Sequence, residues 1–453
     1  MDEKGYIMLL NEKGETIEMT KNYQIPPDAF DYIIFKDGDV VKAKNGRTGR
    51  IEFKENELGK ALNYLVENYY TDHLNVFISP GSYEISEMVA IDKNNVKIVG
   101  AGWEQTKIYI DESLEKVFRL AENSGIVDYV ELGGFSLYGT KDNEQEGIYS
   151  KILNRVLIHD IFFMNVDYPM IFDTQEGNIT RLSNIHIARF KYGISLLGAN
   201  QFLIDNVQVS NWKISPEPVA GTVGIYIGNV KDYTVSMQVG SVLLSNTIIQ
   251  CVEYGVYIGE GAKYVSAMKF DGGLFESVEK VFGIDGTTVT TKSNITLHGT
   301  RVVDNGHTTH IAYGTNLSAR YLYIIWIGGK IDITNSTAVL SNQPYYHIGL
   351  HLKNTHISIP NSPNHFRTEG DGIATFSGDG STTQFNIEHK LYATPRRYFV
   401  QPLTVDANAP FDVSVSGTYI TITYQNPPPS GTDNIKLYWW ASAQNEEASY
   451  SHP

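Results

Sequence analysis

The chain has 453 residues, of which 42% are hydrophobic and 19% charged, a composition typical of a folded protein with a sizeable core. Its formal net charge of -15 argues against nucleic acid or an anionic membrane as the main partner, because both require basic surfaces. No apolar run is long enough for membrane insertion or for a recognisable signal peptide, and a single cysteine, Cys251, excludes an internal disulfide.

The first elements expected along the chain precede a repetitive region. Residues 1–54 contain short strands separated by Asp-Gly and Asn-Gly turns, which predicts a small N-terminal segment. Residues 57–69 place Leu58, Leu62 and Leu65 at helical spacing on one face. We therefore expect a capping helix at 57–69 that covers the open end of the core formed by the residues after it.

Residues 55–368 repeat a pattern of roughly 25 residues, which is the first feature to seek in a chain of this length. In each repeat, strands of alternating apolar and polar residues flank a residue type that enters the left-handed backbone region easily. These corner positions are Gly133, Asp160, Asn184, Asn206, Asn246, Gly272, Gly299, Gly328 and Asn354. Three short strands per repeat predict an all-β fold, a right-handed parallel β-helix whose coils stack about 4.8 Å apart.

The coil pattern ends near residue 368. Residues 369–442 hold alternating strands separated by turns rich in Gly, Pro and Asp, which predicts a small antiparallel β-sandwich. Residues 443–453 are polar, and we expect a loose tail there.

The sequence "VFISPGSYEISEMVAIDKNNVKIVGAGWEQTKIYI" at 76–110, preceded by the capping helix and "AKNGRTG", resembles the opening coils of pectate-lyase-like β-helix proteins. The resemblance is strongest to viral tailspike and receptor-binding proteins. It implies a homotrimer, a glycan ligand and, in many members, depolymerase activity by hydrolysis or elimination. Because a fold does not fix chemistry and no catalytic signature of pectate lyases is recognisable, no family catalytic residues are transferred.

Four carboxylates are the candidate catalytic residues, because equal positions on adjacent coils lie about 5 Å apart. They are Glu253, Glu276, Glu279 and Asp304. We expect Glu253 and Glu279 to stack without an intervening cation, which would raise the pKa of one and leave the other ionised, as a glycosidase requires. The alternative is that all four are ordinary solvated carboxylates on an acidic surface.

Aromatic residues near these acids are the candidate substrate contacts. Trp212 lies on an insertion between Asn206 and Asn246, and Tyr226 and Tyr257 share one outward position on adjacent coils. Arg301 completes the predicted binding residues, which are Trp212, Tyr226, Tyr257 and Arg301. Alternatively, the aromatic side chains pack beneath the inserted loop or against a neighbouring subunit.

The remaining features bear on partners. Outward Ile248 and Leu274 form an apolar strip consistent with subunit contact. Neither metal nor cofactor is expected, since His307 and His310 lack the helical spacing of a zinc motif. Three functions stay open: a polysaccharide hydrolase using paired carboxylates, a non-catalytic adhesin or receptor-binding spike, and a polysaccharide lyase. All three place the protein outside a cell or on a virion.

Overall fold

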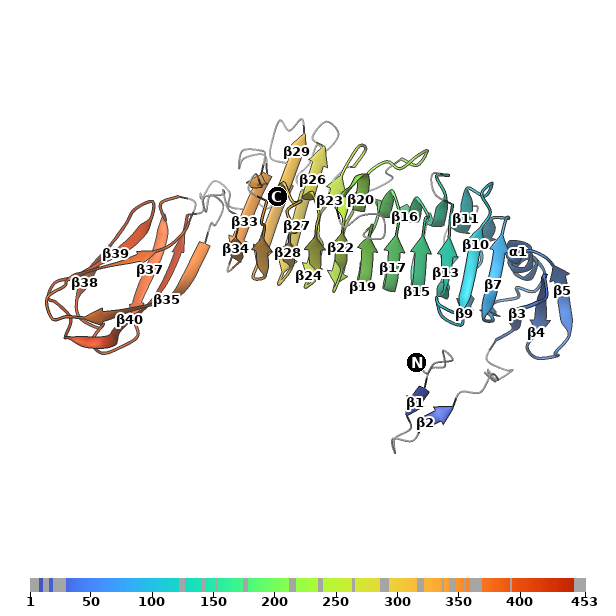
Figure 1. Cartoon of the computed structure of the whole chain (residues 1–453), viewed down its shortest axis with the longest axis horizontal. Coiled ribbons are helices and arrows are strands. Elements are labelled where there is room, and N and C mark those ends of the chain that lie inside the picture. Colours follow the sequence, from blue (N-terminus) through green and yellow to red (C-terminus); the bar gives the residue numbers. More distant parts are fainter. Residues whose placement is uncertain are drawn as a thin grey trace.

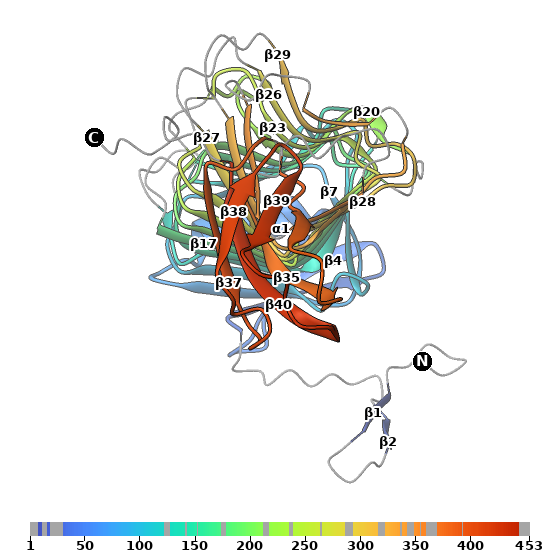
Figure 2. The same ribbon diagram turned by 90° about the vertical axis from the view of Figure 1, so that its left-hand side faces the viewer.

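The computed structural model describes residues 8–10, 16–18, 30–121, 127–140, 143–151, 153–173, 178–211, 217–234, 239–262, 265–285, 293–315, 322–335, 338–341, 348–353, 355–358, 369–391 and 393–443. Parallel strands stack into a long solenoid, with the helix at one end and antiparallel sheets beyond the other (Figure 1). Figure 2 looks along the long axis, where the coils lie behind one another and the C-terminal strands stand in front.

The solenoid is built from two sheets, one of 22 strands that includes the N-terminal meander and one of ten. In the long sheet, the strands that come before a corner are β6 (Leu74–Ile78), β9 (Val96–Gly100), β12 (Val127–Asp128), β21 (Val242–Ser245), β24 (Met268–Asp271), β27 (Ser293–His298), β30 (Leu322–Ile327) and β33 (Ile348–Lys353). Those that follow a corner are β7 (Gly81–Ile85), β10 (Thr106–Ile110), β22 (Ile248–Gln250), β25 (Leu274–Glu276), β28 (Arg301–Val303), β31 (Lys330–Asp332) and β34 (His356–Ser358). Four strands run through the corner: β13 (Glu131–Tyr138), β15 (Leu153–Met164), β17 (Asn178–Ala188) and β19 (Phe202–Ser210).

The ten-stranded sheet closes each coil. Its strands are β8 (Val89–Ile91), β11 (Lys116–Leu120), β14 (Glu146–Ser150), β16 (Tyr168–Asp173), β18 (Tyr192–Gly198), β20 (Val219–Ile227), β23 (Val252–Ile258), β26 (Lys280–Asp285), β29 (His310–Thr315) and β32 (Val339–Ser341). All neighbouring pairs in this sheet are parallel. The predicted right-handed parallel β-helix is therefore confirmed.

The corners form where left-handed backbone was predicted. Asp160, Asn184, Asn206 and Asn246 have φ between 51° and 54°. The amide of Asn206 donates to Oδ1 of Asn184 at 3.2 Å, and the amide of Asn184 donates to the carboxylate of Asp160. Residues that are far apart in the sequence thus lie directly above one another.

Two corner predictions need comment. Gly133 was placed one residue early, because the left-handed residue is Gly134, with φ of 71°. Gly133 instead pairs with His159 and Val99 as an ordinary strand residue. Asn354 falls outside the described residues. The other glycine corners, Gly272, Gly299 and Gly328, have φ between 64° and 72°.

Inward side chains of all the coils form one continuous apolar core that reaches from Tyr32 to Leu352. Alternation explains this core: Ile204 and Val209, on either side of the Asn206 corner, are fully buried. The single cysteine, Cys251, is a buried thiol, as predicted, and burial raises its pKa to about 11.

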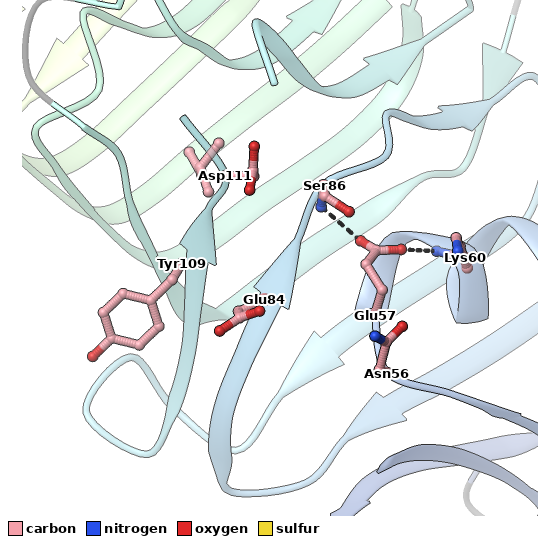
Figure 3. A pocket seen from close by; sticks show the side chains of 8 residues that line it. Asn56, Glu57, Lys60, Glu84, Ser86, Tyr109 and Asp111 are labelled. Atoms are coloured by element: carbon pink, nitrogen blue, oxygen red, sulfur yellow. Dashed lines mark hydrogen bonds between the residues drawn. The ribbon is translucent and has the colours of Figure 1, made fainter. Parts of the chain in front are cut away.

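The helix α1 (Leu58–Asn68) covers the N-terminal end of this core with Leu58, Leu62 and Leu65. Glu57 caps it, because its two carboxylate oxygens accept from the backbone N–H groups of Gly59 and Lys60 at 2.7 and 2.6 Å. The same carboxylate accepts from the N–H of Ser86 at 2.8 Å, which ties the helix to the end of β7 (Figure 3). The predicted capping helix is confirmed.

Antiparallel strands flank the solenoid at both ends. At the N-terminal end are the hairpin β1 (Met8–Leu10) and β2 (Thr16–Glu18) and the meander β3 (Tyr32–Asp37), β4 (Val40–Asn45) and β5 (Ile51–Glu55). At the C-terminal end, β35 (Glu369–Gly378), β40 (Gly431–Ser442) and β37 (Arg397–Pro402) form one sheet, and β36 (Gln384–Glu388), β39 (Tyr419–Tyr424) and β38 (Phe411–Val415) form another. A separate apolar core lies between these two C-terminal sheets, so the predicted sandwich is present. Residues 444–453, the predicted loose tail, lie outside the described residues.

Among the described residues, no helix has the length and apolar character needed to span a bilayer.

Candidate functional site

The outer face of the ten-stranded sheet carries an unusual concentration of tyrosines. We call the outward side chains Tyr192, Tyr226, Tyr254, Tyr257 and Tyr313 the tyrosine face. Tyr226 and Tyr257 point outward because they alternate with the buried Ile225 and Val256, and the tyrosines Tyr192, Tyr226, Tyr254 and Tyr257 gather in an apolar cluster separate from the main core. Tyr226 and Tyr257 pair on adjacent coils, as predicted, with ring centroids 6.1 Å apart.

The tyrosine rings form stacked and tilted pairs, some between coils and some within one strand. Tyr192 stacks on Tyr226 with centroids 4.3 Å apart, and Tyr254 lies 4.5 Å from Tyr257. Gly283 makes room for the rings, because a Cβ at this position would lie 2.6 Å from the rings of Tyr254 and Tyr257. Tyr226 is buried, whereas Tyr192, Tyr254, Tyr257 and Tyr313 are half-buried.

A lysine sits between the two carboxylates predicted to repel each other. Nζ of Lys280 lies 3.0 Å from Glu253 and 3.1 Å from Glu279. The same ammonium lies 4.6 Å from the ring centroid of Tyr254 and 5.2 Å from that of Tyr313. The prediction that no cation separates Glu253 from Glu279 is therefore wrong. The structure does bring both carboxylates to one face, but it pairs them through a shared cation.

The shared cation also changes the expected protonation states. Burial acts to raise the pKa of Glu253, but the N–H of Gly221 at 2.7 Å and the ammonium of Lys280 outweigh it, so this pKa is lowered. For Lys280, burial opposes the charge, yet hydrogen bonds to both glutamates raise its pKa. Glu253 and Lys280 are thus both charged at neutral pH.

Tyr254, Tyr257 and His310, which lie around Lys280, stay neutral at pH 7. Burial raises the pKa of Tyr254 and, with the charge of Asp285, raises that of Tyr257 to about 12. Burial and the nearby Lys280 lower the pKa of His310. Tyr254, Tyr257 and His310 therefore present neutral hydroxyl and imidazole groups beside the charged Glu253 and Lys280.

Glu276 lies on a different sheet from the Glu253 and Glu279 pair. Glu276 ends β25 in the long sheet, where its Oε2 accepts a hydrogen bond from the amide of Gln250. Gln250 in turn accepts from the amide of Gln208 at 2.8 Å. Arg301, in the neighbouring β28, is exposed and pairs in register with Leu274.

Asp304 holds the backbone after β28 in place. It is 4% exposed, and Oδ1 accepts from the N–H groups of His307 and Thr308 at 2.6 and 2.7 Å. Oδ2 accepts from the N–H groups of Thr334 and Asn335, both at 3.2 Å. Burial acts to raise its pKa, but these backbone donors lower it, so Asp304 is an ionised structural carboxylate.

The insertion between Asn206 and Asn246 falls partly outside the described residues, and so does Trp212. Gly221, in the first described part after Trp212, donates its N–H to Glu253 at 2.7 Å, so this part of the insertion lies beside that carboxylate. Residues 228–234 run back over the ten-stranded sheet to reach Arg119 and Glu146. Val230 packs with Tyr226 in an apolar cluster on the outer surface, which matches the alternative in which this tyrosine lies beneath the loop.

The far end of this loop closes over two buried charges that the sequence analysis missed. Arg119 and Glu146 are each 1% exposed, and Nη1 of Arg119 lies 2.8 Å from Oε2 of Glu146. The hydroxyl of Tyr233 accepts from Arg119 at 2.6 Å and donates to Glu146 at 2.9 Å. Nζ of Lys231 lies 3.2 Å from Oε1 of Glu146. Arg119 and Glu146 lie on the adjacent strands β11 and β14 but are not register partners, since Arg119 pairs with Tyr149 and Glu146 with Lys116. Tyr233 is 114 residues from Arg119.

Two hollows lie near the N-terminal end of the solenoid. One, of about 460 Å³, is lined by Glu84, Tyr109 and Asp111 beside the capping residue Glu57 (Figure 3). The other, of about 550 Å³, is lined by Trp103, Lys97, Glu131 and His159 among others. No cluster of three or more His, Cys, Asp or Glu side chains suited to a metal ion is found among the described residues.

No known protein family and no curated protein matches this chain. Among solved structures, the chain is similar to the Gp54 tailspike of Acinetobacter baumannii bacteriophage AP22 in complex with A. baumannii capsular saccharide, at 10% identity and a TM-score of 0.37, covering 82% of this chain and 68% of that chain. It is also similar to the catalytic domain of a GH87 α-1,3-glucanase in complex with nigerose, at 15% identity and a TM-score of 0.43, covering 67% and 64%.

A third similar structure is the A-module of the Azotobacter vinelandii mannuronan C-5 epimerase AlgE4, at 11% identity and a TM-score of 0.36, covering 66% of this chain and 95% of that chain. These similarities concern the parallel β-helix. A fold shared at such low identity does not carry an activity, so the function has to be argued from the surface of this chain itself.

Proposed function

We propose that this protein binds a polysaccharide along the tyrosine face. The observation that carries the proposal is a set of half-buried rings on the outer face of the ten-stranded sheet, with Tyr192 on β18, Tyr254 and Tyr257 on β23, and Tyr313 on β29. Tyrosine rings offer flat apolar surfaces to the C–H faces of sugars, and their hydroxyls bond to sugar oxygens. Because this set extends over several strands along the solenoid axis, it suits an extended chain better than a small molecule.

The charged group within this set supports a polar ligand. Lys280 lies between the rings of Tyr254 and Tyr313 and is held by Glu253 and Glu279. A charge network of this kind adds hydrogen-bond donors and acceptors to the aromatic surface without a net positive charge. This combination favours a glycan over an anionic polymer such as nucleic acid.

Binding to a panel of immobilised polysaccharides tests the proposal. Tyr254→Ala and Tyr257→Ala should each weaken retention about tenfold or more, because each removes an aromatic ring that would pack on the C–H face of a sugar. Tyr419→Ala is the matched control, since Tyr419 is an exposed tyrosine in the C-terminal sandwich. Unchanged binding in both tyrosine-face variants, with unchanged thermal unfolding, would refute the proposal.

Cleavage of the bound chain is the second candidate function. The observation in its favour is that the oxygens of Glu253 and Glu279 that contact Lys280 lie no more than about 6 Å apart, since they lie 3.0 and 3.1 Å from the same nitrogen. This limit is compatible with the carboxylate spacing of a retaining glycosidase. Glu253, whose pKa is lowered, would be the ionised carboxylate, and Glu279 would be the second carboxylate of the pair.

Release of reducing sugar separates cleavage from binding alone. Under the cleavage hypothesis, Glu253→Gln and Glu279→Gln should each lower the rate about 100-fold or more, whereas Glu276→Gln, on the other sheet, should leave it unchanged. If no reducing sugar is released from any polysaccharide that the protein binds, cleavage is excluded and binding as an adhesin is the remaining function. An unsaturated uronate product, detected by its absorbance, would instead indicate elimination.

Assembly and location follow as parts of the same proposal. Ile248 and Leu274 pair in register on adjacent coils and are half-buried in the single chain, which makes an outward apolar strip available to a second copy. We expect a homotrimer, which light scattering coupled to gel filtration would detect. We propose a location outside a cell or on a virion, where a polysaccharide ligand would be met.

A further inference from the structure

A second pocket lies on the long sheet, away from the tyrosine face, and we call it the tryptophan pocket. It has a volume of about 550 Å³ and opens over the strands that precede the corners near the N-terminal end. Its lining comes from β6, β9, β13 and β15 and from the segment that carries Trp103. A pocket of this size is large enough for one or two sugar rings.

One side of the tryptophan pocket is aromatic. Phe30, Phe77 and Trp103 line it, and the rings of Phe30 and Phe77 lie 5.2 Å apart. Trp103 is half-buried and meets the imidazole of His186 edge to face at 4.5 Å, which fixes the position of the indole. The indole therefore offers a rigid apolar surface at the pocket edge.

The other side is polar and consists of a linked set of charged groups. Oε1 of Glu131 lies 2.8 Å from Nζ of Lys97 and 3.1 Å from Nε2 of His159. Nδ1 of the same imidazole lies 2.7 Å from Oδ2 of Asp160, which accepts from the amide of Asn184 through its other oxygen. The two carboxylates thus stand on opposite sides of one imidazole ring, and both line the pocket.

The fold does not require this set of charged contacts for its core packing. Glu131 and His159 occupy outward positions on adjacent coils, where solvated side chains would satisfy the fold equally well. Two acids and two bases lie within contact distance of one another, so the pocket presents both hydrogen-bond donors and acceptors but no excess of positive charge. The carboxylates of Glu131 and Asp160 would repel an anionic sugar but not a neutral sugar.

We propose that the tryptophan pocket is a second carbohydrate site that binds a neutral pyranose unit. The C–H face of the sugar packs on Trp103, and its hydroxyls bond to Glu131, His159 and Lys97. The site is separate from the tyrosine face, since its residues belong to the other sheet of the solenoid. A polymer held on one face would leave this pocket free for a side branch or for a second chain.

An array of neutral gluco-, galacto- and manno-oligosaccharides, with oligouronates as the acidic set, tests this proposal on the full chain. The wild-type protein should bind at least one neutral oligosaccharide. Trp103→Ala should weaken that binding at least tenfold. Glu131→Gln preserves the shape of the side chain and should weaken binding about tenfold by changing an acceptor into a donor. Tyr257→Ala is measured in parallel to report on the tyrosine face, and Tyr419→Ala, at an exposed tyrosine outside both sites, should leave the binding unchanged.

The outcomes distinguish the two carbohydrate proposals. If the neutral oligosaccharides bind Trp103→Ala and Glu131→Gln as tightly as the wild type, or if the wild type binds none of them, the tryptophan pocket is not a carbohydrate site. Loss in Tyr257→Ala alone would overturn this inference and leave the tyrosine face standing. Loss in the pocket variants alone, with thermal unfolding of Glu131→Gln unchanged, supports the pocket whatever the fate of the tyrosine face.

Discussion

Two acidic residues illustrate the difference between a carboxylate that can contact a ligand and one that stabilises the backbone. Glu253 and Asp304 were both candidate catalytic acids, and both have a lowered pKa, but for different reasons. Glu253 is held by one backbone N–H and a shared ammonium on an outer face. Asp304 is surrounded by backbone donors beneath the surface, so it stabilises a turn and faces no ligand.

The structural role of Asp304 gives a stability prediction. Asp304→Asn should lower the free energy of unfolding by about 1–3 kcal/mol at pH 7, because an amide N–H₂ would face backbone donors in place of an acceptor. Urea or thermal unfolding measures this loss. Asp271→Asn is the control, since Asp271 is exposed and lies 3.9 Å from its lysine partner.

The same substitution should also change the acid response. Since the folded pKa of Asp304 lies below the unfolded value near 3.9, its stabilisation is present above about pH 4 and is lost as the pH falls through the folded pKa. The stability difference between wild type and Asp304→Asn should therefore shrink below about pH 4. A difference that stays constant down to pH 2 would contradict this assignment.

At the scale of single elements, two attachments hold the solenoid in shape. The first is the cap on α1, where one carboxylate of Glu57 accepts three backbone N–H groups, two in the helix and one after β7. The second is the loop 228–234, which crosses back over β18 and β16 to reach β14 and β11. That distance is four strand spacings, or about 19 Å.

The contribution of the α1 cap to stability can be tested by replacing the carboxylate of residue 57 with an amide. Glu57→Gln should lower the unfolding free energy by about 1–2 kcal/mol, because one of its oxygens becomes a donor that faces a backbone N–H. Glu67→Gln, at an exposed position on the same helix, should have no measurable effect. Equal melting temperatures for the two variants would show that the capping contacts contribute little.

The loop 228–234 depends on the hydroxyl of Tyr233. Tyr233→Phe should cost about 1–3 kcal/mol, because Arg119 and Glu146 are buried and each loses a hydrogen-bond partner. The loop should also be cut faster in limited proteolysis. Tyr109→Phe, at a tyrosine that is 43% exposed, is the control. Proteolysis at the wild-type rate would argue against this anchor.

Much of the fold was predictable because it depends on local rules. The residue type of Asn206 predicts a corner. The alternation of apolar and polar residues predicts that Ile204 and Val209 are buried in the core. The helical spacing of Leu58 and Leu62 predicts the helix. The site was predicted only in part. Lys280 directly follows Glu279 in the sequence, but which glutamates share it depends on side-chain directions that coil register alone does not give.

Other site features could not have been predicted from spacing. Tyr233 reaches Arg119 by a loop path that no periodicity encodes. Glu276 and Glu279 are three residues apart, yet a left-handed residue, Ser277, turns the chain between them, and they face different directions. A one-residue error at a corner, as at Gly133, reverses which side of the strand a residue occupies.

At the scale of the whole molecule, the described residues contain two large apolar cores that do not merge. One fills the solenoid and the other fills the C-terminal sandwich. Cores that share few contacts unfold separately. Scanning calorimetry should therefore resolve two transitions.

Core substitutions should assign the two transitions. Leu297→Ala, in the solenoid, and Ile422→Ala, in the sandwich, each remove a fully buried side chain and should each cost about 2–5 kcal/mol. Each should shift only the transition of its own core. A single transition that both variants lower equally would show that the two parts unfold as one cooperative unit.

The residue-for-residue pairing of adjacent coils also has an evolutionary consequence. Since each coil presents to the next the same surface that it receives from the one before, duplication or deletion of a whole coil would leave a matching junction. The solenoid can therefore lengthen or shorten along its axis in steps of one strand spacing while its cross-section stays constant. The distance between the proposed sugar-binding surface and either end of the solenoid would thus change separately from the binding chemistry.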